Sequence, residues 1–131
     1  MKELDNIKGL FKKIPEIKLA YLFGSRAQGK VGPLSDYDFA IYVGTKSNKR
    51  AYEIKLSLMD QLSRLLKSDK IDVVILNSAA GPEMKYHIIT SGKLLFERAP
   101  YKVMIEPRIY NEYFDFRLIL SRYGLTRSRP T

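Results

Sequence analysis

The chain of 131 residues contains no cysteine and one histidine, His87. Without cysteine it cannot form a disulfide, a thiolate metal site or a cysteine nucleophile, and a single histidine excludes a histidine-rich zinc or iron site. Any bound metal would therefore be held by carboxylates, which favours Mg²⁺ or Mn²⁺. No serine or aspartate is positioned to form a triad with His87, which is interpreted as a structural residue of a helix.

Long hydrophobic runs are also lacking. No apolar stretch approaches the roughly 18 residues of a membrane span, and the N-terminal segment MKELDNIKGLFKK has no apolar core of the kind found in signal peptides. A cytoplasmic protein with no membrane partner is therefore expected. The length fits a single domain over residues 1–131, and no repeat, low-complexity tract or linker marks a second one.

Acidic residues are in the minority, with 14 Asp and Glu against 23 Lys and Arg, a net charge of +9. This balance indicates an anionic partner, such as nucleic acid, nucleotide phosphates or an acidic protein, although a solvated basic surface gives the same count. The sequence has no dense arginine tract and no aromatic pattern of an RNA-binding motif. Nucleic acid is therefore expected as a partner only indirectly, through another protein.

The spacing of apolar residues predicts alternating helices and strands. Segments with helical spacing are 3–14, 48–67, 82–91 and the region from residue 100 onward, which Pro107 interrupts. Short apolar or alternating runs that predict strands are 18–23, 36–43, 71–76 and 93–97. The sequence thus predicts an α/β (α+β) fold, in which helices flank a small mixed sheet. The core covers about 17–98, and a C-terminal helical extension covers about 100–123.

The stretch LFGSRAQGKVGPLSDYDFAI, residues 22–41, contains the candidate site. Its segment GSRAQGK fits the phosphate-binding pattern G-x-x-x-x-G-K, but Val31 stands where a P-loop requires the Ser or Thr that binds Mg²⁺. Gly32 and Pro33 would also break the helix whose N-terminus a P-loop directs at the phosphates. These two differences exclude a P-loop.

Other residues of the same stretch predict a different phosphate site. Gly24 ends a strand and permits a tight turn, and Ser25 with neighbouring backbone N–H groups offers a small anion cradle. Asp36 and Asp38, two residues apart on a strand, project from the same face. Their mutual repulsion favours a divalent cation between them. Asp72, near the start of a neighbouring strand, is the candidate for a third carboxylate.

The chain contains Gly-Ser, then ten residues, then Asp-x-Asp, and later an aspartate on a strand that follows a long helix. This combination resembles the nucleotidyltransferase superfamily of the DNA polymerase β type. The form GSRAQG…SDYDFAI is most similar to the minimal nucleotidyltransferases, the MNT antitoxins that are paired with HEPN-domain toxins. The resemblance covers about residues 17–98, and the segment EYFDFRLIL resembles the C-terminal helix of that group. One departure is Gln28, where the family often has arginine.

The resemblance implies a role for each candidate residue. Asp36 and Asp38 would ligate two Mg²⁺ ions (Mn²⁺ is an alternative), and Asp72 would ligate one of them and act as general base. The implied nucleotide-binding residues are Gly24, Ser25, Arg26 and Lys30; Ser25 would contact the β- and γ-phosphates. Tyr42, on the same strand face as the two aspartates, is a candidate for contact with the base.

The implied reaction is transfer of AMP from ATP to a hydroxyl, that of a tyrosine, on a cognate HEPN ribonuclease toxin, which silences the toxin. A hetero-oligomer with that toxin is expected, with the aromatic, basic C-terminal helix as a contact surface. Two alternatives remain open. One is a non-catalytic antitoxin that acts by occlusion. The other is a nucleotidyltransferase for a small molecule of the aminoglycoside type, for which a chain of this length has little room.

Overall fold

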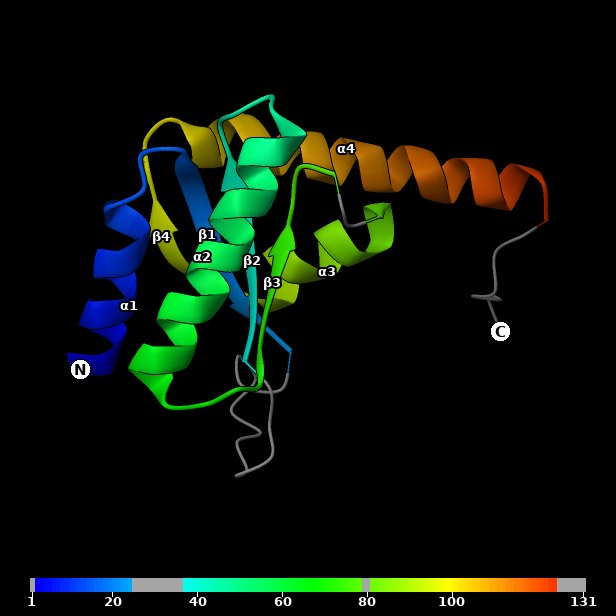
Figure 1. Ribbon diagram of the computed structural model, residues 1–131. Coiled ribbons are helices and arrows are strands. Elements are labelled where there is room, and N and C mark those ends of the chain that lie inside the picture. Colours follow the sequence, from blue (N-terminus) through cyan, green and yellow to red (C-terminus); the bar gives the residue numbers. More distant parts are fainter. Residues whose placement is uncertain (1, 25–36, 79–80, 125–131) are drawn as a thin grey trace.

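The computed structural model describes residues 2–24, 37–78 and 81–124, which form four strands and four helices (Figure 1). In chain order these are α1 (Lys2–Lys12), β1 (Ile17–Phe23), β2 (Tyr37–Val43), α2 (Asn48–Leu66), β3 (Ile71–Ile75), α3 (Pro82–Ser91), β4 (Lys93–Glu97) and α4 (Tyr101–Arg122). The predicted mixed α/β fold is confirmed, and the ends of the elements lie within two residues of the prediction.

The four strands form one mixed sheet in the order β3-β2-β1-β4. β1 pairs antiparallel with β2 and with β4, whereas β2 pairs parallel with β3. As a consequence, the C-terminal end of β1 lies at the same edge of the sheet as the N-terminal ends of β2 and β3. The predicted site residues Gly24, Asp38 and Asp72 lie at this edge.

Helices cover both faces of the sheet (Figure 1). α1 and α2 pack on one face through buried residues such as Phe11, Ile54 and Leu58, in a cluster with Phe39 and Ile41 of β2. α3 and α4 pack on the other face, where the buried cluster contains Leu19, Tyr21, Ala40, Ile88, Ile105 and Ile109. Alternate residues of β2 therefore face two different cores, so that Ala40 is as buried as its neighbours. The alternation of apolar and polar residues over 36–43 predicts one well-buried face on this strand, whereas the structure buries residues on both faces.

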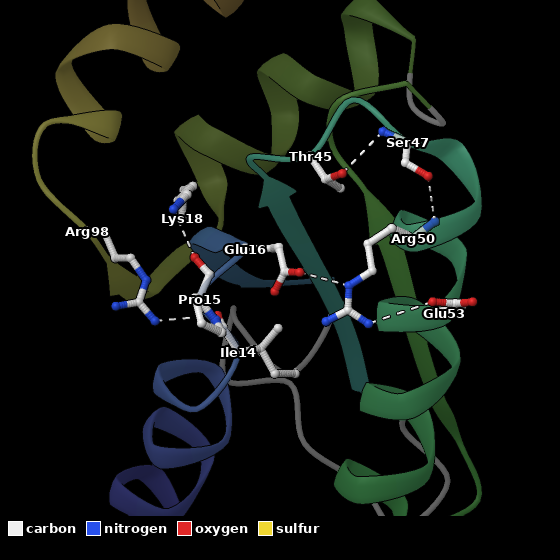
Figure 2. A network of polar contacts seen from close by, with 9 residues as sticks. All are labelled: Ile14, Pro15, Glu16, Lys18, Thr45, Ser47, Arg50, Glu53 and Arg98. Atoms are coloured by element: carbon white, nitrogen blue, oxygen red, sulfur yellow. Dashed lines mark hydrogen bonds and ion pairs between the residues drawn. The ribbon is translucent and has the colours of Figure 1, made fainter.

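Polar contacts fix the chain at the sheet edge opposite the candidate site (Figure 2). Arg50 on α2 donates a hydrogen bond from Nε to the Glu16 carboxylate at 2.8 Å, while the Ser47 hydroxyl caps α2 by accepting from the backbone N–H of Arg50. The Arg98 guanidinium donates to backbone carbonyls of Lys12 and Ile17. These contacts tie α1, α2 and β4 to the start of β1.

α4 continues through Pro107, although the sequence predicted an interruption there. A proline inside a helix removes one backbone donor and crowds the carbonyl four residues earlier, which here belongs to Val103. Val103 is exposed, so this carbonyl can turn toward water. The buried residues Ile105 and Ile109 on either side of Pro107 hold the helix against the sheet. The predicted break was therefore wrong, because packing outweighs the local propensity.

Within the described ranges, no helix is long and apolar enough to cross a membrane.

Candidate functional site

Two of the three predicted carboxylates lie side by side in the sheet. Asp38 on β2 and Asp72 on β3 are direct partners in the register of the parallel pair. Partners of this kind lie about 4.8 Å apart and point to the same face. This is the face covered by α3 and α4, because Ala40 and Val74, two residues further along each strand, pack in that cluster. Asp38 is half-buried and Asp72 is exposed, so the pair is open to a ligand.

Gly24 lies directly against the Asp38 carboxylate. It follows the last residue of β1, Phe23, which is the register partner of Asp38. Its φ of +80° is in the left-handed region, and a Cβ placed on it would lie 2.6 Å from Asp38 Oδ2. Both the backbone conformation and the contact therefore require glycine. The Gly24 backbone thus forms one wall of the space in which the Asp38 carboxylate lies.

An open hollow of about 570 Å³ adjoins this edge of the sheet. Its lining combines Phe23 from the end of β1 with one side of the first turns of α3, namely Gly81, Pro82, Glu83, Met84 and His87. The volume is in the usual range for small-molecule sites. None of these residues has a site role that the sequence predicts. The sequence predicts the helix over residues 82–91 but does not indicate that this helix lines a hollow. His87, on the lining side of the helix, is exposed.

Four predicted site residues lie outside the described ranges: Ser25, Arg26, Lys30 and Asp36. Their predicted roles remain predictions. Among the residues that the structure does describe, no group of three or more His, Cys, Asp or Glu side chains could hold a metal ion. The described part of the candidate metal site is thus the Asp38–Asp72 pair.

Tyr42 lies away from this pair, although it is on the same face of β2. It is four positions further along the strand than Asp38, which corresponds to about 13 Å. Its ring packs near that of Tyr101, with 6.3 Å between centroids, and lines a smaller cavity of about 190 Å³ between β2, α3 and α4. The position of Tyr42 gives no support to its predicted contact with the base.

Residues 5–101 match the family model described as polymerase beta, nucleotidyltransferase. A protein adenylyltransferase MntA from Aphanizomenon flos-aquae is 30% identical over 129 residues, which are 93% of this chain and 79% of the relative. The chain belongs to the polymerase beta-type nucleotidyltransferases, in their MNT branch.

Two further matches agree with this assignment. A protein adenylyltransferase MntA from Shewanella oneidensis is 37% identical over 91 residues. These are 69% of this chain and 61% of that relative, so the match spans less than two thirds of its length. A crystal structure of a toxin–antitoxin with AMP-PNP, an ATP analogue, superposes with a TM-score of 0.75 at 27% identity, and covers 94% of this chain and 95% of the other.

The chemistry of the site follows from its oxygen donors. Two adjacent carboxylates repel each other unless a cation shares them, and hard oxygen ligands suit Mg²⁺ or Mn²⁺. The two described donors are both carboxylates and the chain has no cysteine, so this donor set does not favour zinc. Asp38 and Asp72 would hold such a metal, and Phe23, the register partner of Asp38, lines the neighbouring hollow. This arrangement can bind a metal–nucleotide complex.

Proposed function

We propose that this protein transfers AMP from ATP to a tyrosine hydroxyl of a cognate HEPN-domain toxin, in the cytoplasm, and thereby silences the toxin. The observation that carries the proposal is the Asp38–Asp72 register pair beside Gly24, in a chain of the MNT branch. The name of the relatives, protein adenylyltransferase, supports the reaction type. The complex that contains a toxin and an ATP analogue supports the substrate and the class of partner.

In the proposed mechanism, Asp38 and Asp72, together with Asp36, would hold the Mg²⁺ ions that accompany ATP. When bound, the metal ions neutralise the charge that develops on the attacking and leaving oxygens. Asp72 accepts the proton of the acceptor hydroxyl, since it is the exposed member of the described pair. The acceptor oxygen then forms a bond to the α-phosphorus, and the bond to pyrophosphate breaks. Ser25, Arg26 and Lys30 are proposed to hold the phosphates.

The second half of α4 is the proposed contact surface for the toxin. It extends beyond the sheet (Figure 1) and leaves large apolar side chains in solvent, with exposed fractions of 56% for Phe114, 56% for Leu118 and 52% for Ile119. Behind them, Tyr86 of α3 and Tyr113 of α4 stack at 3.8 Å between ring centroids and stiffen the base of this surface. Apolar groups gathered in this way are typical of a protein interface.

The first test is transfer of label from α-labelled ATP, in the presence of Mg²⁺, to the toxin that co-purifies with the chain. Asp38→Asn should abolish transfer and leave thermal stability equal or slightly higher, because it removes one of two like charges. Asp60→Asn is the matched control, since Asp60 is exposed on α2 and pairs with Arg64. Normal turnover by Asp38→Asn would rule out the metal-binding role.

The same experiment separates the alternatives. If wild type labels no protein but still binds the toxin as tightly as Asp38→Asn, the protein acts by occlusion. If the label enters only small molecules, the acceptor is not the toxin. For the contact surface, Leu118→Asp should reduce co-purification of the toxin, whereas Leu56→Asp, at a 48% exposed leucine of α2, should not.

A further inference from the structure

The cavity of about 190 Å³ between β2, α3 and α4 has no role in the proposed reaction. Tyr42, one of its lining residues, lies about 13 Å along β2 from Asp38. The volume is below the usual range for small-molecule sites, so a ligand here must be small. The lining nevertheless combines charged side chains with buried apolar ones, which indicates a ligand with both an ionic and an apolar part.

Lys85 of α3 brings a weakly paired ammonium group to this cavity. Its side chain is only 15% exposed, and within residues 2–24, 37–78 and 81–124 its one polar partner is Glu112 of α4, with 3.4 Å between Nζ and Oε1. Hydrogen bonds from nitrogen to oxygen are normally about 2.7–3.2 Å long, so this contact is weak. An ammonium group has three donors, and leaving them unpaired in a largely buried position is unfavourable. Lys85 therefore favours a further acceptor in the cavity.

Arg108 of α4 adds a second positive charge to the lining. It is four residues from Glu112, so both side chains project from the side of α4 that lines the cavity. Among the residues that the structure describes, its guanidinium makes no hydrogen bond or ion pair. A guanidinium binds a carboxylate through two parallel hydrogen bonds. Since Lys85 and Glu112 are opposite in sign, the lining carries one positive charge in excess, which a single carboxylate would balance.

We propose that this cavity binds a small monocarboxylate with a short hydrocarbon chain. The carboxylate accepts hydrogen bonds from Arg108 and Lys85. The chain lies on the buried apolar residues of the lining, which are Leu76, Ile105 and Ile109. A phosphate group fits less well, because its charge of nearly two at pH 7 exceeds the excess positive charge of a lining that already contains a carboxylate. The cavity is remote from the metal edge, so the inference does not rest on the proposed function.

The test is a titration of the full chain, labelled with ¹⁵N, with sodium butyrate, followed by NMR, with sodium chloride at the same ionic strength as the reference. We expect saturable shifts of the backbone signals of Leu76, Ile105 and Ile109, with a dissociation constant in the millimolar range for so small a ligand. Acetate should bind about tenfold more weakly, because butyrate buries two more methylene groups. Inorganic phosphate should also bind more weakly than butyrate, because of its higher charge.

Two charge changes on α4 should act in opposite directions. Arg108→Gln should weaken butyrate binding by about tenfold or more, since it removes a charge-assisted pair of hydrogen bonds. Glu112→Gln should strengthen binding by about threefold, because it removes the carboxylate that competes for Lys85. Arg64→Gln is the matched control and should leave binding unchanged, since Arg64 is an exposed arginine of α2 that does not line the cavity.

The opposite signs separate the proposed site from a general loss of structure, which would weaken binding in both variants. Arg108 and Glu112 are both exposed, so we expect the fold to tolerate either change, and a melting curve of each variant checks this. Equal butyrate affinity in wild type and a folded Arg108→Gln would overturn the proposal. Shifts in wild type that chloride reproduces at the same ionic strength would overturn it as well.

Discussion

Replacing Gly24 by alanine tests whether the contact between the Gly24 backbone and Asp38 controls activity. The added Cβ would lie 2.6 Å from Asp38 Oδ2, closer than non-bonded atoms approach. The carboxylate must therefore move by several tenths of an ångström or rotate away. Because Asp38 is proposed to hold a metal ion, this movement displaces the metal and the α-phosphate together.

The expected size of the effect differs between stability and activity. Alanine in the left-handed region destabilises the fold by about 1–2 kcal/mol, and each kcal/mol lowers the melting temperature by roughly 3–4 °C in a domain of this size. A displacement approaching 1 Å at a reacting centre can lower the rate by about 100-fold. Gly24→Ala should therefore remain folded at 25 °C and lose most of its transfer activity.

Gly124→Ala separates backbone strain from the clash. Gly124 also has a positive φ, of +68°, but a Cβ there would meet no atom within 4 Å. This variant should show no more than the same loss of stability and should keep the wild-type rate. The assay is transfer of AMP from α-labelled ATP to the toxin under single-turnover conditions, with a thermal melt of each variant. A wild-type rate in Gly24→Ala, or an equal loss of activity in Gly124→Ala, would refute the reasoning.

Two further predictions concern stability. Burial, and then the 2.6 Å hydrogen bond that it donates to Glu106, raise the pKa of the Tyr21 hydroxyl well above its usual range. The stabilisation that the Tyr21 hydroxyl contributes is therefore present below pH 10 and is lost as the pH rises further. In an absorbance titration, one of the nine tyrosines should ionise only when the protein unfolds. Tyr21→Phe should lower the unfolding free energy by about 1 kcal/mol in urea; no change would contradict the role of this bond. The hydrogen bond from Arg50 lowers the pKa of Glu16 below its ordinary value of 4.5, so its stabilisation is complete above that pH and is lost as the pH falls through the lowered pKa. Glu16→Gln should lower the midpoint of urea unfolding at pH 7 but not at about pH 2. An equal loss at both pH values would contradict a stabilising role of the ionised Glu16 carboxylate.

The parts of the fold with a strong local pattern could be predicted from the sequence. Strict alternation in DYDFAIYV and 3- and 4-residue steps in α2 are properties of single elements, so they identify β2 and α2 without knowledge of the rest. The motif spacing also placed Asp72 near the start of a strand next to β2. The structure agrees, and it adds that Asp72 is the register partner of Asp38.

The remaining features depend on contacts between elements distant in the sequence. Nothing near Pro107 indicates that Ile105 and Ile109 on either side of it are buried, and this packing is what keeps α4 continuous. Likewise, the hollow combines the end of β1 with α3, about 60 residues later in the chain, because of the sheet order. Local sequence gave the helix around His87 but could not reveal which surface its side chain faces.

The arrangement of the strands also bears on why this protein would need a partner. β2 pairs antiparallel with β1 on one side and parallel with β3 on the other. This arrangement brings Gly24 and the carboxylates of Asp38 and Asp72 to one edge of the four-stranded sheet. Within residues 2–24, 37–78 and 81–124, the surface around this edge offers a hollow for one small ligand, lined by β1 and α3. In the proposed reaction ATP is held at this edge by Asp38 and Asp72, so the acceptor hydroxyl must approach from solvent, carried by a separate molecule. The exposed apolar residues of α4, such as Phe114 and Leu118, would then hold that molecule in place, so that substrate recognition and partner binding become the same event.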